Sequence, residues 1–167
     1  MEAGGRKDDM IKFLLCIIAV SLCVLLAWLL TRKYRLRMQF YYNLNLFNER
    51  LVNEVSYTKI PLPAFMEKYT FNGDFKRMLE VKRDARFDNG DEGCDMDYLS
   101  EDERKFLGDY FRMIGKSDAA SQRTYLSAMR EEIAEKKQKS EELYRKYFSL
   151  YIKLGFLAGL ILVVLIV

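Results

Sequence analysis

Apolar and polar positions divide the chain into distinct stretches. Residues 13–30 form a run of eighteen positions without a charge, and residues 154–167 form a second run of fourteen. A helix needs roughly 20 apolar residues to cross about 30 Å of hydrocarbon. The pattern therefore predicts four parts: an N-terminal tail over 1–12, a transmembrane anchor over 13–30, a helical domain over 31–153 and a C-terminal membrane segment over 154–167.

The first apolar run has the features of an anchor that is not removed. A cleaved signal peptide has a shorter apolar core and a cleavage site of the small-x-small type. Here the core is long and is followed directly by Thr31-Arg32-Lys33-Tyr34-Arg35, which holds no such site. We therefore expect this segment to stay in the membrane.

The second apolar run is shorter, since fourteen helical residues rise only about 21 Å. A helix that begins near residue 147 would reach across if the Lys153 amine extended to the interface. Tyr147 and Tyr151 would then belong to an aromatic belt. The alternative is a tail that enters the bilayer without crossing it, and we favour the span.

Between the runs, apolar residues recur at helical spacing. The first anchor is expected to continue as a helix to about Tyr57, and the last helix to run from a cap at Ser117 or Asp118 into the C-terminal segment. Three shorter helices are expected over 64–69, 75–86 and 100–114. The apolar face of the first helix consists of Leu36, Phe40, Leu44, Phe47, Leu51 and Val55.

Helix boundaries are marked by breakers and caps. Pro61 and Pro63, the only prolines, end the first helix, and Gly115 ends the fourth. Ser100 with Glu103 forms a capping box. Because no alternating β-branched run indicates a strand, the fold class is all-α. We expect an antiparallel bundle of about six helices, whose N- and C-terminal transmembrane helices are continuous with the first and last bundle helices.

Basic residues beside the anchors indicate the orientation in the membrane. The first anchor is followed by a basic cluster, and Lys153 precedes the second apolar run. Basic residues accumulate on the cytoplasmic side, so the helical domain is expected in the cytoplasm. This explanation is favoured over a patch for nucleic acid or acidic lipid. The basic cluster consists of Arg32, Lys33, Arg35 and Arg37.

Small residues in the apolar runs suggest close helix packing. Gly155 and Gly159 form a GxxxG pattern, which lets helix backbones approach closely in lipid. In the first run Ala19, Cys23 and Ala27 lie four residues apart on one face. We expect these two faces to pack together, or to pair between subunits of a homo-oligomer.

The composition argues against an enzyme. The chain has no histidine, which removes the commonest general base and metal ligand. Its three cysteines form no zinc or disulfide pattern. The acidic loop over 88–97 fails as an EF-hand, because Gly90 and Leu99 stand where ligands are needed. No cofactor, metal or nucleic acid is expected.

Several short motifs resemble the stage III sporulation protein AB family, in family order. Leu154-Gly155-Phe156-Leu157-Ala158-Gly159-Leu160 is similar to its LG-x-LAGL tail. Glu54-Val55-Ser56-Tyr57 with Pro61-Leu62-Pro63-Ala64 resembles its E-[IV]-x-Y…PLP segment. A third stretch resembles its LG…LG-x-SD…Q pattern, and consists of Leu107-Gly108, Ile114-Gly115-Lys116-Ser117-Asp118 and Gln122.

The resemblance implies a role in endospore formation, in the mother-cell membrane that faces the forespore. The family's soluble domain resembles the cytoplasmic domain of type II secretion and type IV pilus platform proteins. The resemblance further implies that the protein is a non-enzymatic platform of a channel complex. Such a platform docks a secretion-type ATPase, similar to stage III sporulation protein AA, to ring-forming membrane partners. We expect docking on the charged helix over 130–145 or on the acidic loop.

Two alternatives stay open. One is a stand-alone two-anchor membrane sensor or signalling subunit, and the other is a secretion or competence platform outside sporulation. Full platform proteins usually carry the helical domain twice, and this chain carries one copy, which favours the sporulation role.

Overall fold

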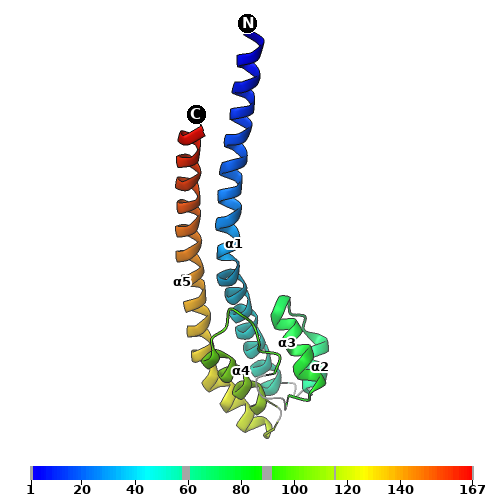
Figure 1. Cartoon of the computed structure of the whole chain (residues 1–167). Helices are drawn as coiled ribbons and strands as arrows, with labels where there is room; N and C mark the ends of the chain where they lie inside the picture. The colour runs from blue at the N-terminus through cyan, green and yellow to red at the C-terminus, as the bar shows by residue number, and fades with distance from the viewer. Residues whose placement is uncertain (1, 58–60, 88–91, 115, 167) are drawn as a thin grey trace. The chain divides into compact units, whose positions relative to one another are not determined.

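A computed structural model describes residues 2–57, 61–87, 92–114 and 116–166, and this part of the chain contains helices and no strand (Figure 1). The expected all-α class is therefore confirmed. Five helices follow one another: α1 Glu2–Tyr57, α2 Leu62–Lys68, α3 Gly73–Asp84, α4 Glu101–Met113 and α5 Ala119–Ile166.

The expected count of about six helices is too high by one within the described residues, although the helix ranges predicted individually already numbered five, with a loop after residue 86. The segment between α3 and α4 is rich in Asp and Gly, and its described part forms turns. Gly93 has a φ of +81°, which side-chain-bearing residues rarely adopt, so a helix does not continue through it. Residues 2–12, expected to form a tail, belong to α1. Residues 88–91 of the acidic loop and Gly115 lie outside the described residues.

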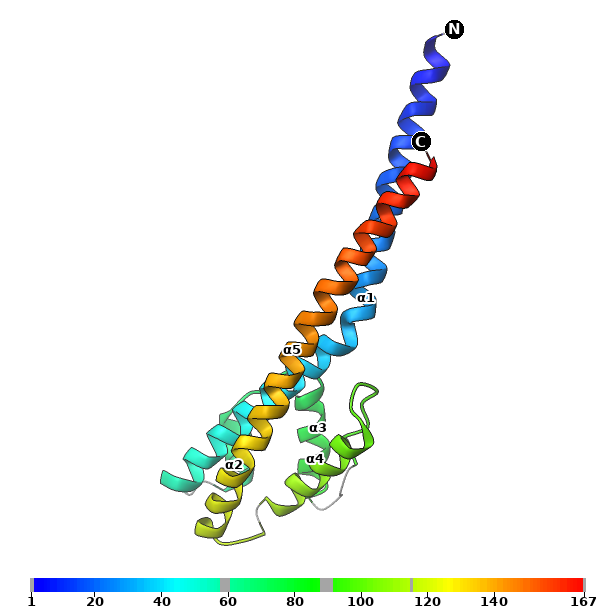
Figure 2. The same ribbon diagram turned by 90° about the vertical axis from the view of Figure 1, so that its left-hand side faces the viewer.

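The chain divides into two compact units, which are described separately. Unit 1 combines Met1–Tyr34 with Glu142–Val167, and unit 2 comprises Arg35–Glu141. In unit 1 the segments of α1 and α5 pair side by side (Figures 1 and 2). They are antiparallel, because Gly155 lies against Cys23 and Ala27, whereas the later Gly159 lies against the earlier Val20.

Unit 2 is built around an aromatic core. The Phe47 side chain of α1 is fully buried and contacts four other phenylalanine rings, with centroids 5.4 to 5.8 Å away. Aromatic pairs at this separation add to the free energy of burial. These four rings come from α2, from α4 and from α3 with the segment before it, namely Phe65, Phe71, Phe75 and Phe111.

The expected apolar face of the first helix is largely confirmed. Phe40, Leu44, Phe47 and Leu51 are at most 2% exposed, and Val55 packs at the edge of the core. Both α4 and α5 also bury an apolar face. The buried residues are Leu107, Tyr110 and Phe111 of α4, Ile114 directly after it, and Leu126 and Ile133 of α5.

The expected caps of α4 and α5 are present. The Glu103 backbone N–H donates to the Ser100 hydroxyl, and the Ser100 N–H donates to the Glu103 carboxylate, so the capping box is complete. The Asp118 carboxylate accepts from the backbone N–H groups of Ala120 and Ser121. These bonds satisfy donors that the first turn of a helix leaves without partners.

Candidate functional site

The two apolar helices of unit 1 meet at their small residues. A Cβ atom added to Gly155 would lie 3.0 Å from the Ala27 Cβ and 3.1 Å from the Cys23 carbonyl oxygen. One added to Gly159 would lie 3.3 Å from the Val20 Cα. The absence of a side chain at both positions therefore permits the close approach of the helices.

The structure brings together four of the residues singled out for helix packing, and Ala27 is 4% exposed. Ala19, the fifth, is half-buried and is not among the atoms nearest either glycine. Val20 lies against Gly159 instead. It was not predicted, because valine is larger than the residues that mark close helix packing. A face drawn at four-residue steps drifts around a helix with 3.6 residues per turn, which accounts for the difference.

Both helices of unit 1 are long and apolar enough to cross a membrane. The most apolar stretches of α1 and α5 have mean hydropathies of 3.0 and 2.3, and only 6% of each stretch is buried. Exposed leucines such as Leu14, Leu26 and Leu157 would be costly in water, at about 25 cal/mol per Å² of apolar surface. These surfaces suit a hydrocarbon environment.

Aromatic side chains gather in unit 1 near the ends of the apolar runs. The rings of Tyr34 and Tyr147 stack with centroids 4.3 Å apart, and Tyr147 also stacks on Tyr151 at 6.1 Å. Trp28 is 44% exposed nearby along α1. Such rings are typical of the water interface of a membrane. Tyr34 was not anticipated, because a single tyrosine in a basic segment carries no pairing signal.

The predicted orientation residues fall into two groups. Arg32, Lys33 and Lys153 of unit 1 are exposed, whereas Arg35 and Arg37 of unit 2 are half-buried. Since the Arg37 guanidinium donates to the Glu103 carboxylate at 2.7 Å, this arginine also connects α1 to α4.

Glu103 is the centre of a buried polar cluster in unit 2. Its carboxylate accepts from the Tyr41 hydroxyl at 2.6 Å, from Arg37 and from the Ser100 N–H. Burial acts to raise the pKa of Glu103, but the hydrogen bonds from Tyr41 and Ser100 and the charge of Arg37 outweigh it and lower the pKa. Burial and the same carboxylate raise the pKa of Tyr41. The cluster is a structural connection between α1 and the start of α4, because Tyr41, Arg37 and Ser100 all donate to one carboxylate.

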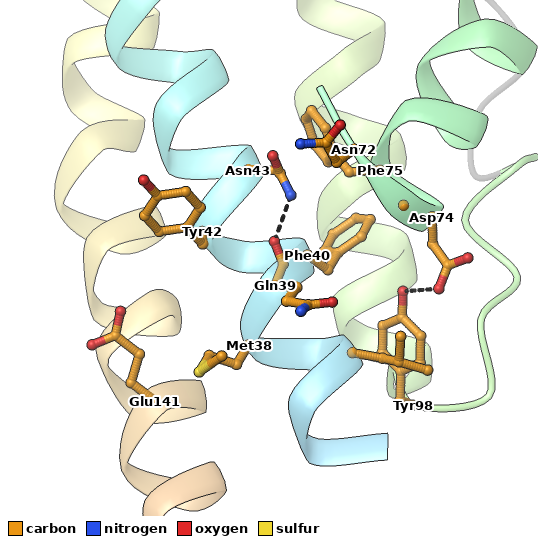
Figure 3. Close-up of a pocket in the computed structure, with 12 residues that line it drawn as sticks. Met38, Gln39, Phe40, Tyr42, Asn43, Asn72, Asp74, Phe75, Tyr98 and Glu141 are labelled. Atoms are coloured by element: carbon orange, nitrogen blue, oxygen red, sulfur yellow. Dashed lines mark hydrogen bonds between the residues drawn. The ribbon is translucent and has the colours of Figure 1, made fainter. Parts of the chain in front are cut away.

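A pocket of about 430 Å³ opens beside α1 in unit 2 (Figure 3). Figure 3 shows the amide groups of Gln39, Asn43 and Asn72 around it, with Asp74 and Glu141 at its sides. Asp74 accepts a hydrogen bond from Tyr98 at 3.0 Å, and the Asn43 amide donates to the Gln39 carbonyl. No basic side chain is among the described residues that line this pocket, so its charged groups are acidic, beside apolar side chains such as Leu36, Phe40 and Phe75.

The expected docking surface on α5 is described in full, whereas the acidic loop is described only in part. On α5, Lys136 pairs with Glu132 at 3.4 Å and Lys137 with Glu141 at 3.8 Å, as in a solvated helix face. In the acidic loop, Asp95 pairs with Arg104 at 2.7 Å, while residues 88–91 lie outside the description.

The described residues offer no metal site, since no group of three or more Cys, Asp or Glu side chains is placed to hold an ion. Cys16, Cys23 and Cys94 form no disulfide in the part of the chain that the structure describes. Cys94 is buried with its sulfur 3.7 Å from that of Met78, so it is part of the core.

Comparison with known proteins assigns the family. The sequence profile of the stage III sporulation protein AB family matches residues 12–167. Comparisons with curated proteins and with solved structures gave no match. The matched region covers both apolar helices and all of unit 2, and it includes the motifs on which the resemblance was based. The chain therefore belongs to the stage III sporulation protein AB family.

Proposed function

We propose that this protein is a non-enzymatic membrane platform that docks a secretion-type ATPase to ring-forming membrane partners during endospore formation. Membership of the family implies a role in sporulation. The observation that carries the proposal is the combination, in one chain, of two exposed apolar helices and a folded domain. The most deeply buried polar groups of that domain are used in structural contacts. A platform needs anchors and a rigid surface, and it needs no catalytic groups.

The location that follows from this proposal is the mother-cell membrane around the forespore, with unit 2 in the cytoplasm. The exposed basic residues Arg32, Lys33 and Lys153 support this orientation through the positive-inside rule. Cysteine labelling tests it, because Ser127 is exposed on α5 whereas Cys94 is buried. A Ser127→Cys variant should react with a membrane-impermeant thiol reagent only after the cells are opened. Labelling in intact cells would place unit 2 outside.

The docking role is tested by co-purification from sporulating cells. The full chain, solubilised in mild detergent, should recover the secretion-type ATPase of the same organism. Exposed charges on α5, such as Arg130 and Lys139, are the first positions to reverse, and a matched reversal at exposed Arg123 serves as the control. Loss of the ATPase in R130E/K139E but not in R123E supports docking on this helix.

A sensor or signalling subunit is the contrasting function. It predicts normal stability and membrane insertion but no recovery of the ATPase from any preparation. A secretion platform outside sporulation predicts ATPase recovery, together with normal spore counts when the gene is deleted. The platform proposal requires both ATPase recovery and a loss of spores.

A further inference from the structure

A second groove of unit 2, about 480 Å³ in volume, lies where α1, α2 and the ends of α3 and α4 meet. We call it the proline groove, because Pro61 and Pro63 line it. Both prolines are exposed, whereas Ile114 and Phe87 at its base are buried. Its other apolar lining residues include Val55, Leu62 and Met66, which are half-buried. The groove thus offers apolar surface to an incoming side chain.

The polar lining of the proline groove is basic. Arg83, Arg86 and Lys116 contribute to it and are all exposed, and no acidic side chain is among the described lining residues. Arg83 has an exposed carboxylate neighbour, since its Nε lies 3.3 Å from Asp84. The charge of the groove is opposite to that of the acidic pocket in Figure 3.

Arg86 adopts a backbone conformation that favours glycine. The end of α3 forms a Schellman motif: the Phe87 N–H donates to the Lys82 carbonyl at 2.7 Å, and the Arg86 N–H donates to the Arg83 carbonyl at 3.0 Å. The left-handed position of this motif is usually a glycine, but here it is Arg86 with a φ of 51°. A side chain costs free energy in this region, and such outliers cluster at functional sites.

Segments that resemble the family meet at this groove, although they are far apart in the sequence. Val55, Pro61 to Pro63, Ile114, Lys116 and Gln122 all line it. Within unit 2, the core of apolar residues accounts for Ile114. Pro61 and Pro63 form the start of α2, and both leave exposed surface at the groove.

We propose that the proline groove binds an acidic segment of a partner chain, with an apolar side chain of that segment seated against Pro63, Met66 and Phe87. The carboxylates of the segment would face Arg83 and Arg86, so that charge complementarity selects the partner. The proposal rests on the proposed function only in that a platform has partners. The groove proposal adds the chemistry of one partner, and it adds a binding surface that is separate from the charged face of α5.

The test uses the full chain in nanodiscs of neutral lipid and a fluorescein-labelled peptide in which leucine and phenylalanine alternate with glutamate. The control peptide has lysine in place of glutamate. We expect the acidic peptide to bind and the basic peptide not to bind. An exposed ion pair contributes about 0.2–1 kcal/mol, so R86G should weaken binding by a factor of about 1.4 to 5, and R83A/R86G should weaken it further.

Arg86→Gly separates binding from folding, because glycine is the preferred residue at this φ. Its thermal unfolding midpoint should be equal to or above that of the parent chain, while R86K should retain binding. Arg77, an arginine of α3 that is not among the groove's lining residues, gives the matched control R77A with unchanged affinity.

Three results would overturn the proposal. The first is equal binding of the acidic and basic peptides. The second is binding of the acidic peptide that R86G and R83A leave unchanged. The third is a dimer of the full chain that R86G dissociates, which would assign the groove to a second copy. If the ATPase still co-purifies when the peptide fails, the groove proposal alone is lost and the platform function stands.

Discussion

The Tyr41 hydroxyl of α1 donates a 2.6 Å hydrogen bond to the Glu103 carboxylate of α4, across 62 positions of sequence. Glu103 also closes the capping box with Ser100 and accepts from Arg37. A local helix start signal and a long-range contact thus share one side chain, which is only 7% exposed. The start of α4 and its attachment to α1 are therefore coupled.

Replacement of Glu103 by alanine should destabilise unit 2 more than the loss of an ordinary helix cap. Removal of a cap costs about 1 kcal/mol, and leaving a buried hydroxyl such as that of Tyr41 without its acceptor adds about 1–3 kcal/mol. The sum can be measured by chemical unfolding of the full chain in micelles. S100A is the matched control, because it removes the cap and leaves the Tyr41 contact intact. Equal losses for E103A and S100A would contradict the coupling.

The same carboxylate predicts a pH dependence of stability. The folded-state pKa of Glu103 lies below its ordinary value of 4.5, so the folded state favours the ionised form. This contribution is fully present above pH 4.5 and is lost as the pH falls through the lowered folded-state pKa. Thermal unfolding midpoints should therefore fall on acidification, and they should fall less in E103Q, which has no charge to lose. Parallel pH profiles for the two proteins would exclude Glu103 as the cause.

Asn48 holds three helices together and should be sensitive to truncation. Its amide donates to the Leu126 carbonyl of α5 at 3.2 Å, and its oxygen accepts from the Tyr110 hydroxyl of α4 at 2.9 Å. N48A leaves the buried Tyr110 hydroxyl without this acceptor, at a cost of about 1–3 kcal/mol, and it removes the bond to the Leu126 carbonyl, at a cost of about 0.5–1.5 kcal/mol. Y110F removes one bond and should cost less. A double-mutant cycle in unfolding experiments measures the coupling, and additive losses would show that the contact is energetically silent.

Phe47 should be the most costly single truncation in the aromatic core. It is fully buried and touches rings from α2, α3 and α4, so F47A opens a cavity that several elements line. Phenylalanine to alanine changes in cores cost about 3–5 kcal/mol. Y57A, at a residue that is 83% exposed, is the control with little effect. A small loss for F47A in urea unfolding would mean that the core is not closely packed.

Helical spacing was informative about which residues are buried and less so about what they contact. The apolar face of α1 and the capping box of α4 were predicted because both depend on local periodicity. The bond between Arg37 and Glu103 was not, because the facing partner depends on how each helix is rotated and placed by the others. Arg37 was instead assigned to the membrane interface on its charge alone.

The proline groove illustrates the same limit. Pro61 was interpreted as a residue that ends a helix and Gln122 as part of a family motif. Neither interpretation indicated that the two residues lie close together. Their meeting at one groove follows from the path of the chain through α2, α3 and α4. Arg86 gave no sequence signal either. It was expected as the last residue of the helix over 75–86, where an arginine normally indicates only a favourable interaction with the helix dipole.

The contact between α1 and α5 in unit 1 predicts effects of different size for substitutions at its two glycines. A Cβ at position 155 would lie 3.0 Å from the Ala27 Cβ, closer than any contact at position 159, where the nearest atom is 3.3 Å away. G155A should therefore weaken the pairing of α1 and α5 more than G159A, and leucine at either position should separate the helices. Single hydrogen bonds between membrane helices contribute about 0.6–2 kcal/mol, and we expect the loss of close packing at one glycine to be of the same order. Unfolding by titration with dodecyl sulfate measures this loss, and L157A, at a lipid-facing residue that is 55% exposed, is the matched control. A change at Leu157 alters the same segment of α5 and leaves its contact with α1 unchanged. Equal effects of G155A and L157A would therefore mean that the glycines do not hold the helices together.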